Sequence, residues 1–180
     1  MAGGAVLKRK SVYWALLAIA ILLVTFWLDY RAGLFGPEVE KGADDIVGVA
    51  QIIDGDSLRV SGHEIRLKGI DAFEYRQTCG AFRCGADGTL YLKKLTHGRT
   101  VMCADKGRDR YQRVLAYCRT TTEDGKAVDL GQAMIEAGLA VRYYDTGNRY
   151  AASERMAKHE ERGAWAHPFT PPSEYRRQSY

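Results

Sequence analysis

Residues 65–74 read IRLKGIDAFE and combine a strand-like pattern with the charged residues Arg66, Asp71 and Glu74. Apolar and charged residues alternate over the first four positions, which is typical of a half-buried strand whose side chains point to opposite faces. Arg66 therefore points away from the core. The turn that leaves this strand carries Asp71 and Glu74, so an arginine and two carboxylates fall within nine positions and can converge on one ligand.

A second acidic turn lies just upstream, where residues 53–57 read IDGDS. Apolar stretches at 47–52 and 58–60 flank it, so the two acidic turns can close on each other across a sheet. By itself, Asp54-Gly55-Asp56 would be a tight turn with solvated carboxylates. Together with Arg66, the two acidic turns indicate a site for a metal ion and an anion.

Apolar periodicity predicts five short strands, which together suggest a small barrel. We expect them at 46–53, 57–61, 64–69, 100–105 and 113–119. Three helices are also predicted, each ending at a glycine that can adopt the left-handed conformation of a helix stop. They are expected around 90–95 before Gly98, around 130–137 before Gly138, and over 150–162 before Gly163. Asp129 and Ser153 are candidate N-caps. The tail from Pro168 is expected to be an irregular strap or a frayed end.

The amino-terminal segment predicts a membrane anchor. Lys8-Arg9-Lys10 precedes eighteen residues without a charge, 11–28. At about 1.5 Å per residue, this length matches the hydrocarbon core of a bilayer. The basic cluster predicts a single-pass protein of the inner or plasma membrane, with its folded domain on the periplasmic or extracellular side. A cleaved signal peptide is the alternative, although no small-x-small site follows the apolar run. A buried core helix is disfavoured because the segment has no polar face.

Composition divides the chain into five segments. Residues 29–45 are rich in glycine, carry charges of both signs and show no sustained periodicity, as expected of a linker. The predicted organisation is a cytoplasmic terminus at 1–10, the anchor at 11–28, the linker at 29–45, one folded domain at 46–167 and a tail at 168–180.

The net charge of the chain says little about whether it binds nucleic acid. Its formal net charge is +4, and residues 1–43 account for half of it, so global charge does not indicate a nucleic-acid-binding protein. Local charge is more suggestive, since basic residues cluster at Lys93, Lys94, Arg99, Lys106, Arg108, Arg110 and Arg113. Such a cluster is usually a solvated face unless it lies beside a site that needs positive charge.

Four cysteines favour disulfides over free thiols in an exported domain. Cys79 and Cys84 share one short loop, whereas Cys103 and Cys118 fall on consecutive predicted strands that would be antiparallel neighbours. Cross-strand partners lie near the separation that a disulfide requires, so the preferred pairs are Cys79–Cys84 and Cys103–Cys118. A zinc site is the competing interpretation, but the spacing lacks the paired short knuckles of structural zinc.

Several motifs, in the same order along the chain, resemble those of the thermonuclease family, typified by staphylococcal nuclease. They are residues 53–57, 66–74, 109–117, 136–140 and 163–165, within a match that spans about 46–167. The resemblance implies a five-stranded oligonucleotide-binding barrel with three helices, which agrees with the predicted elements. With the anchor included, the expected fold class is α+β, an oligonucleotide-binding barrel preceded by one transmembrane helix.

The resemblance also implies a metal site. Asp56 and Asp71 resemble the calcium carboxylates of the family, and the backbone carbonyl of Ala72 resembles a further ligand. Hard oxygen donors favour calcium or magnesium over softer metals. The expected cofactor is therefore Ca²⁺, with another divalent ion as the alternative.

The catalytic groups implied by the resemblance are Arg66, Arg113 and Glu74. The two arginines resemble those that grip the phosphate, and Glu74 resembles the general base that activates the attacking water. Arginine suits this role because its planar fork matches phosphate oxygens and keeps its charge. Charge that builds on the phosphate oxygens is then stabilised more in the transition state than in the ground state.

Further positions resemble substrate-binding residues of the family. Arg110 and Tyr111 match positions that help to hold a neighbouring phosphate, and Tyr144, or in another register Tyr143, supplies an aromatic wall.

Two residues depart from the family pattern: Phe73 stands where the family usually has proline, and Gln112 where it usually has glycine. Proline restricts its own backbone and that of the residue before it. Phenylalanine therefore predicts a looser turn, with Asp71 and Glu74 less preorganised. The alternative is that Phe73 packs into the mouth of the barrel or stacks on a substrate base, and so fixes the turn by burial.

The function implied by the resemblance is that of a calcium-dependent endonuclease, which hydrolyses phosphodiester bonds of DNA or RNA. The expected partners are a single-stranded or unwound nucleic acid and the membrane, and the sequence indicates no protein partner. Two other classes stay open: a noncatalytic barrel that binds single strands, and a structural domain whose acidic turns only bind calcium. Glu74 together with both arginines favours the nuclease, because binding alone does not need a general base.

Overall fold

The structure is a computed structural model that describes residues 13, 14, 16–25, 45–143 and 147–179. The chain divides into two compact units, Met1–Glu40 and Lys41–Tyr180. In the first unit, residues 16–25 are helical and their side chains are exposed. No helix within the described residues combines the length and the apolar character needed to cross a membrane. The predicted anchor at 11–28 extends beyond the described residues at both ends, and Lys8-Arg9-Lys10 lies outside them.

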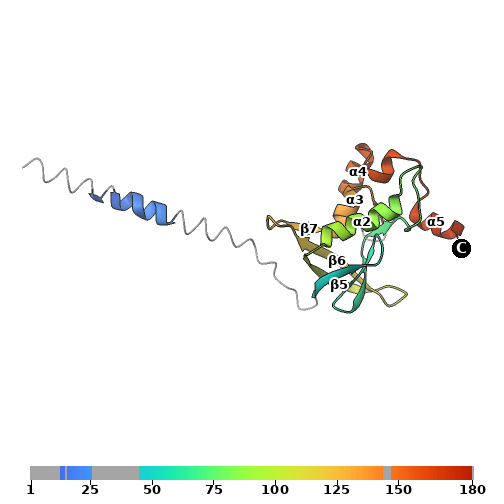
Figure 1. Ribbon diagram of the computed structural model, residues 1–180, viewed down its shortest axis with the longest axis horizontal. Coiled ribbons are helices and arrows are strands. Elements are labelled where there is room, and N and C mark those ends of the chain that lie inside the picture. The colour runs from blue at the N-terminus through green and yellow to red at the C-terminus, as the bar shows by residue number, and fades with distance from the viewer. Residues whose placement is uncertain (1–12, 15, 26–44, 144–146, 180) are drawn as a thin grey trace, which may run out of the picture. The chain divides into compact units, whose positions relative to one another are not determined.

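Five strands of the second unit form a closed barrel, as the sequence predicts (Figure 1). They are β1 (Asp45–Ile52), β2 (Ser57–Val60), β3 (His63–Leu67), β5 (Thr100–Arg108) and β6 (Val114–Thr121). The sheet runs in the order β3-β2-β1-β5-β6, and a parallel pairing of β3 with β6 closes it. A barrel of this kind leaves few strand edges open to other chains, since each of the five strands has a neighbour on both sides.

Three short strands were not predicted. β7 (Ala127–Asp129) pairs with β6, and β4 (Ile70–Ala72) pairs with β8 (Ala140–Arg142) in a separate two-stranded sheet. Three residues are too few to display a period, so tertiary pairing rather than local pattern creates these strands. The β4–β8 pair matters for function because β4 carries Asp71.

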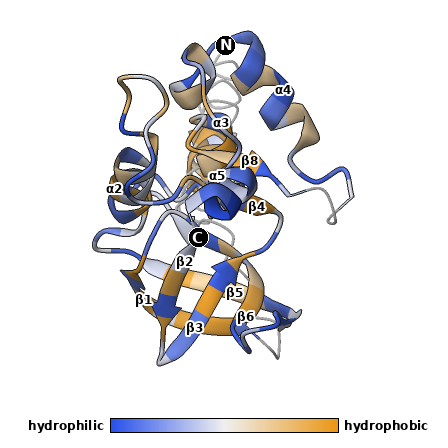
Figure 2. Ribbon diagram, turned by 90° about the vertical axis from the view of Figure 1, so that its right-hand side faces the viewer, coloured by the Kyte–Doolittle hydropathy of each residue, from blue (hydrophilic) through white to orange (hydrophobic). Residues whose placement is uncertain are grey.

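The helices lie on one end of the barrel (Figure 2). They are α2 (Cys84–Thr96), α3 (Leu130–Glu136), α4 (Ala151–His159), the 3-10 helix η2 (Gly163–Ala166) and α5 (Pro172–Ser179). The three predicted helices correspond to α2, α3 and α4. The tail, expected to be irregular or frayed, instead forms α5, whose first residue, Pro172, is buried.

Of the two predicted N-caps, Asp129 is confirmed and Ser153 is wrong. Asp129 is the N-cap of α3, and its side chain accepts a hydrogen bond from the backbone of Gln132. Ser153 is not a cap: it lies inside α4, where it is buried and donates a hydrogen bond to Glu136. Tyr150 occupies the N-cap position of α4 in a left-handed conformation. The packing of α4 against α3 therefore decides the role of Ser153.

Gly138 and Gly163 meet where α3 and the end of α4 pack together. Both have positive φ, and a Cβ on Gly138 would lie 1.9 Å from the carbonyl oxygen of Arg162. Only glycine allows this approach. Gly138 ends α3 as predicted, whereas α4 already ends at His159 and Gly163 begins η2.

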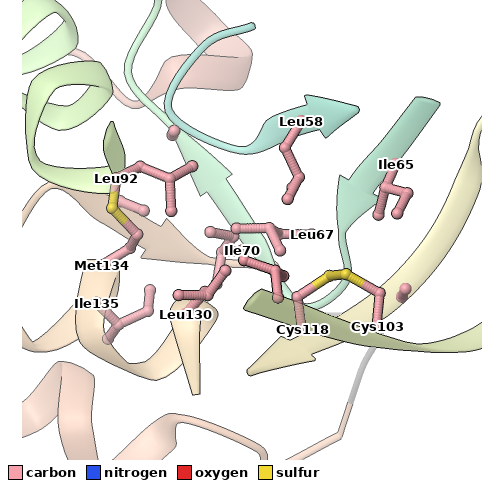
Figure 3. Close-up of a cluster of buried hydrophobic side chains, with 14 of the residues drawn as sticks. Leu58, Ile65, Leu67, Ile70, Leu92, Cys103, Cys118, Leu130, Met134 and Ile135 are labelled. Carbon is pink, nitrogen blue, oxygen red and sulfur yellow. A yellow bond between two sulfur atoms is a disulfide. The ribbon is translucent and has the colours of Figure 1, made fainter. Parts of the chain in front are cut away.

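The core fills the space between the barrel and the helices. Ile65 and Leu67 of β3 are buried while Arg66 between them is partly exposed, as the alternation predicts. Figure 3 shows how side chains from the barrel and from α2 and α3 meet in one cluster. Its largest fully buried members include Leu58, Ile65, Leu67, Ile70, Leu92, Leu130, Met134 and Ile135.

Both predicted disulfides are present, and the zinc interpretation is wrong. Cys103 and Cys118 are direct partners in the β5–β6 register, with Cα atoms 4.0 Å apart, and their bond lies in the core (Figure 3). Cys79 and Cys84 are joined beside the start of α2. This second disulfide belongs to a separate apolar cluster with Phe73 and Ala164, against which Phe169 packs.

Candidate active site

The two acidic turns meet at one arginine. Arg66 on β3 donates from Nη1 to Oδ1 of Asp56 at 2.6 Å and from Nη2 to Oδ1 of Asp71 at 2.9 Å. Asp56 and Asp71 are only 4% and 2% exposed, so their carboxylates reach the site from within the protein. The predicted convergence of these three side chains is confirmed.

Backbone contacts lock the turns together. Asp54 Oδ1 accepts from the backbone N–H of Asp56, and Asp56 Oδ2 accepts from the backbone N–H of Ala72 at 2.9 Å. Gly55 lies so close to β4 that a Cβ there would meet the Cβ of Ala72 at 2.8 Å. The glycine in the first turn is therefore required by the approach of the second turn.

Burial and neighbouring charges shift the pKa values of Asp56 and Arg66 in opposite directions. Burial raises the pKa of Asp56 to about 7, although the nearby Arg66 guanidinium opposes the rise. Burial alone would lower the pKa of Arg66, but Asp56 and Asp71 raise it above its ordinary value. Arg66 thus stays charged, and it holds the two carboxylates in a fixed relative position.

A second arginine, which the sequence did not indicate, enters from α5. Arg176 donates from Nη1 to Glu74 Oε1 at 2.8 Å, and from Nη2 to Asp71 Oδ2 at 2.9 Å and Oδ1 at 3.1 Å. Burial lowers the pKa of Arg176, but the bonds to Asp71 and Glu74 outweigh it, so the net shift is upward. Only the basic pair Arg176-Arg177 in the tail could have pointed to this contact, and a basic pair at a chain end is usually solvated.

The turn between Asp71 and Glu74 is fixed by burial. Phe73 is only 3% exposed, and its ring packs edge-to-face on Phe169 with centroids 5.1 Å apart. Gln77 accepts from the backbone N–H of Glu74 and donates to the carbonyl of Thr170 at 2.7 Å. The expectation of a loose turn at Phe73 is wrong, because the segment after η2 packs against that turn and holds it.

Arg113, the second arginine implied by the resemblance, binds Asp109 and not the carboxylates that Arg66 binds. Leu115 is the register partner of Arg66 on β3, and Arg113 lies two residues before it, immediately ahead of β6. Its side chain donates to Asp109 Oδ2 from Nε at 2.8 Å and forms an ion pair through Nη2 at 2.7 Å. Among the described residues, the ion pair of Arg113 is the one with Asp109, outside the cluster of Asp56 and Asp71.

The other predicted substrate residues flank this arginine. The Arg110 guanidinium lies 4.7 Å from the ring centroid of Tyr111, and the Arg113 guanidinium lies 5.5 Å from it. Tyr111 is 63% exposed and, with Arg113, lines an open cleft of about 550 Å³. Gln112 adopts a positive φ of 66°, the conformation that explains the glycine usual at this position.

Tyr144 lies outside the described residues. Tyr143, the other candidate for the aromatic wall, is 47% exposed. It lines a second cavity, of about 590 Å³, together with Asp71, Trp165 and Phe169. Tyr143 thus lines the same cavity as Asp71, and its role as the aromatic wall stays a prediction.

A family model described as staphylococcal nuclease homologue matches residues 64–167, which include Arg66, Asp71, Glu74 and Arg113. The chain belongs to this family. The match ends before α5, so the staphylococcal nuclease homologue pattern does not include Arg176.

Three curated relatives are similar to the chain, and two of them are named as endonucleases. The chain is 37% identical over 130 residues to the succinoglycan biosynthesis protein ExoI of Rhizobium meliloti (strain 1021), covering 68% of this chain and 66% of that protein, slightly less than two thirds. It is 34% identical over 129 residues to a protein of Escherichia coli named as an endonuclease, covering 68% of this chain and 78% of the relative. A Haemophilus influenzae protein, also named as an endonuclease, is 33% identical over 139 residues, or 72% of each chain. The matches support a nuclease hydrolase.

Staphylococcal nuclease homologues are generally calcium-dependent, and the donor set here suits a hard cation. Asp56 and Asp71 present carboxylates that already share one guanidinium, and carboxylate oxygens are the ligands that calcium prefers. Ala72, the predicted carbonyl ligand, is buried beside them. Across the described ranges, no group of three or more His, Cys, Asp or Glu side chains is arranged to hold a metal. The oxygen donors of these residues are of the type that calcium prefers. In this structure, however, both carboxylate oxygens of Asp71 accept hydrogen bonds from Arg176.

Proposed function

We propose that the chain is a calcium-dependent endonuclease, tethered to a membrane, that hydrolyses phosphodiester bonds of single-stranded or unwound DNA or RNA. The observation that carries this proposal is the clamp of Arg66 between Asp56 and Asp71, next to Glu74. A structural ion pair would need one carboxylate, whereas this cluster gathers three carboxylates and two arginines at one end of the barrel.

Each residue of the cluster has a distinct task in hydrolysis. Calcium, when bound by Asp56, Asp71 and the carbonyl of Ala72, would supply positive charge at the phosphate. Arg66 would hold a nonbridging oxygen through its planar fork and stabilise the charge that builds there in the transition state. Glu74 would accept a proton from the attacking water, which requires a carboxylate within hydrogen-bond reach of that water.

The β5–β6 loop would bind the substrate beside the reacting phosphate. Arg113 immediately precedes β6, the strand that pairs with the β3 strand of Arg66, and would exchange its bond with Asp109 for a phosphate oxygen. Arg110 stacks on the exposed ring of Tyr111, an arrangement in which one side chain can contact a phosphate and the other an unpaired base. A base is free to stack in this way only where the strand is single or unwound.

The membrane tether is supported by the sequence of the first unit. Residues 11–28 carry no charge, and a basic cluster precedes them. The two disulfides of the folded domain also favour an oxidising compartment. Protease added outside the inner or plasma membrane should digest the folded domain and leave a short protected fragment. A domain that is protected until the membrane is permeabilised would contradict this orientation.

The nuclease proposal is tested with labelled single-stranded DNA or RNA and the purified full chain, in calcium or in chelator. We expect cleavage in calcium only, and Glu74→Gln should lower the rate by about 10²–10⁴-fold. Glu123→Gln is the matched control because Glu123 is an exposed glutamate of the same domain. Undiminished cleavage by a folded Glu74→Gln variant would remove the assigned role, and tight binding without cleavage would favour a noncatalytic barrel.

A further inference from the structure

Arg176 engages two carboxylates of the proposed function, that of Asp71, which would bind the cation, and that of Glu74, which would act as the general base. Its Nη2 donates to both carboxylate oxygens of Asp71, and its Nη1 donates to Glu74. A carboxylate whose two oxygens both accept from a guanidinium has lost the lone-pair directions best suited to a metal. Arg176 and a divalent cation therefore compete for Asp71.

The tail is built to bring Arg176 to this place. Phe169 packs on Phe73 and on Trp165, the carbonyl of Thr170 accepts from Gln77, and Pro172 is fully buried. These contacts attach the segment before α5 to the turn that carries Glu74. Figure 2 shows α5 beside β4, at the end of the barrel that carries the helices. The helix is thus held at the acidic cluster from its first turn.

The far half of α5 has a different character. Arg177, Gln178 and Ser179 are exposed, and the side chain of Arg176 is itself 35% exposed. An ion pair that is partly open to solvent is screened and is weaker than a buried one. Arg176 can therefore leave the cluster for water without moving the anchor formed by half-buried Phe169 and fully buried Pro172.

We infer that α5 is a built-in guard of the active site, in which Arg176 takes the place of the divalent cation on Asp71 and engages Glu74 until a cation displaces it. This inference rests on the proposed function, because it concerns the same carboxylates. Asp71 Oδ1 already accepts from Arg66 as well as from Arg176, and Oδ2 accepts from Arg176. A divalent cation on Asp71 would need the oxygen directions that Arg176 occupies, and its charge would repel the guanidinium. Cation binding and release of Arg176 are consequently linked, and the linkage is reciprocal: the Arg176 contact weakens cation binding by the same factor by which the cation weakens the Arg176 contact.

The test compares Arg176→Ala with Arg177→Ala in the full chain in detergent, without substrate. Calcium affinity is measured by calorimetry, and terbium luminescence serves as a second probe of the same site. We expect Arg176→Ala to bind calcium more tightly by roughly 5- to 150-fold, the usual range of coupling between two linked events. Arg177→Ala, one residue further along the same helix and exposed, should bind calcium as the unmodified chain does.

The reciprocal effect is read from hydrogen exchange in α5. Calcium should speed exchange of the amides of residues 174–179 in the unmodified chain and should have little effect on them in Arg176→Ala. A calcium affinity in Arg176→Ala that is equal to or weaker than that of the unmodified chain would overturn the guard. If the unmodified chain cleaves in calcium while Arg176→Ala shows no gain in affinity, only the guard fails. If the unmodified chain neither binds calcium nor cleaves, the proposed function fails with it.

Discussion

The ring of Phe73 packs edge-to-face on the ring of Phe169, 5.1 Å away between centroids, and so joins the turn that carries Glu74 to the segment that leads into α5. Burial does here what a proline would do in most of the family, because a ring that is 3% exposed leaves the turn little freedom. The contact also explains why the structured region extends past residue 167, where the family match ends.

Loss of the Phe73 ring should destabilise the domain. Phe73→Ala is expected to lower the free energy of unfolding by about 3–5 kcal/mol, the usual range for a buried phenylalanine. Phe73→Pro should also lower it, since proline cannot fill the space against Phe169. Denaturant unfolding measures both, with Tyr75→Ala as control because Tyr75 is 61% exposed. A Phe73→Pro variant as stable as the unmodified chain would show that the ring does not hold the turn.

Gly55→Ala should push the two acidic turns apart. The added Cβ would lie 2.8 Å from the Cβ of Ala72, so the Asp56 carboxylate must shift relative to Asp71. A displacement of about 1 Å at a catalytic group can cost on the order of a hundredfold in rate. We expect a loss of cleavage of that size, measured as kcat/KM, with the fold retained.

The double variant Gly55→Ala with Ala72→Gly is the matched control for that experiment. Removing the Cβ of Ala72 removes the atom that the new methyl group meets and leaves the backbone carbonyl of residue 72 in place. Activity should recover at least in part. Equal loss in the single and double variants would mean that Gly55 acts through its backbone freedom and not through this approach.

Asp109 should make stability depend on pH. Burial alone would raise its pKa, but hydrogen bonds from the Arg113 side chain and from the backbone N–H groups of Arg113 and Tyr111 lower it below the ordinary 3.8. A carboxyl with a depressed folded-state pKa stabilises the fold above its unfolded pKa, and this contribution is lost as pH falls through the folded-state pKa. Asp109→Asn should therefore cost about 1 kcal/mol near pH 7 and progressively less below about pH 4.

Thermal unfolding of the Asp109→Asn variant and the unmodified chain at pH 7 and pH 3 measures this difference. Asp124 is a poor comparison because its own pKa is also lowered, by a hydrogen bond from Thr122. Glu123→Gln is the better control, since Glu123 is exposed and lies in the same domain. A difference between Asp109→Asn and the unmodified chain that stays constant from pH 7 to pH 3 would show that charge plays no part.

The two disulfides should contribute unequally to stability. A disulfide stabilises mainly by restricting the unfolded chain, and the effect grows with the length of the loop that it closes. Cys103–Cys118 spans 15 residues and Cys79–Cys84 spans 5. Replacing both members of the longer pair by alanine should cost about 3 kcal/mol, and replacing the shorter pair should cost less. Denaturant unfolding of the two double variants compares them, and a larger loss for Cys79–Cys84 would place its contribution in local packing.

Local periodicity and motif spacing predicted the barrel and the convergence of Asp56, Asp71 and Arg66. The period of two at Ile65, Arg66 and Leu67 separates core from surface without knowledge of the partner strand, because successive side chains of a strand point to opposite faces. Asp56 and Asp71 could be found because each is an acidic residue in a short segment between apolar stretches of the sequence, although Asp71 lies on the short strand β4 and not in a turn. The Cys103–Cys118 pair followed from the antiparallel order of two consecutive strands.

Tertiary structure alone decided the features that join distant parts of the chain. Arg176 meets Glu74 across 102 residues, and no local pattern in a short polar tail encodes that contact. Serine is a common N-cap residue. The packing of α4 on α3 nevertheless places Ser153 inside the helix, where it donates a hydrogen bond to Glu136. Phe73 could be either free or buried until Phe169 was placed against it. Local periodicity reports which face of an element is apolar, whereas the identity of the partner depends on how the whole chain closes around its core.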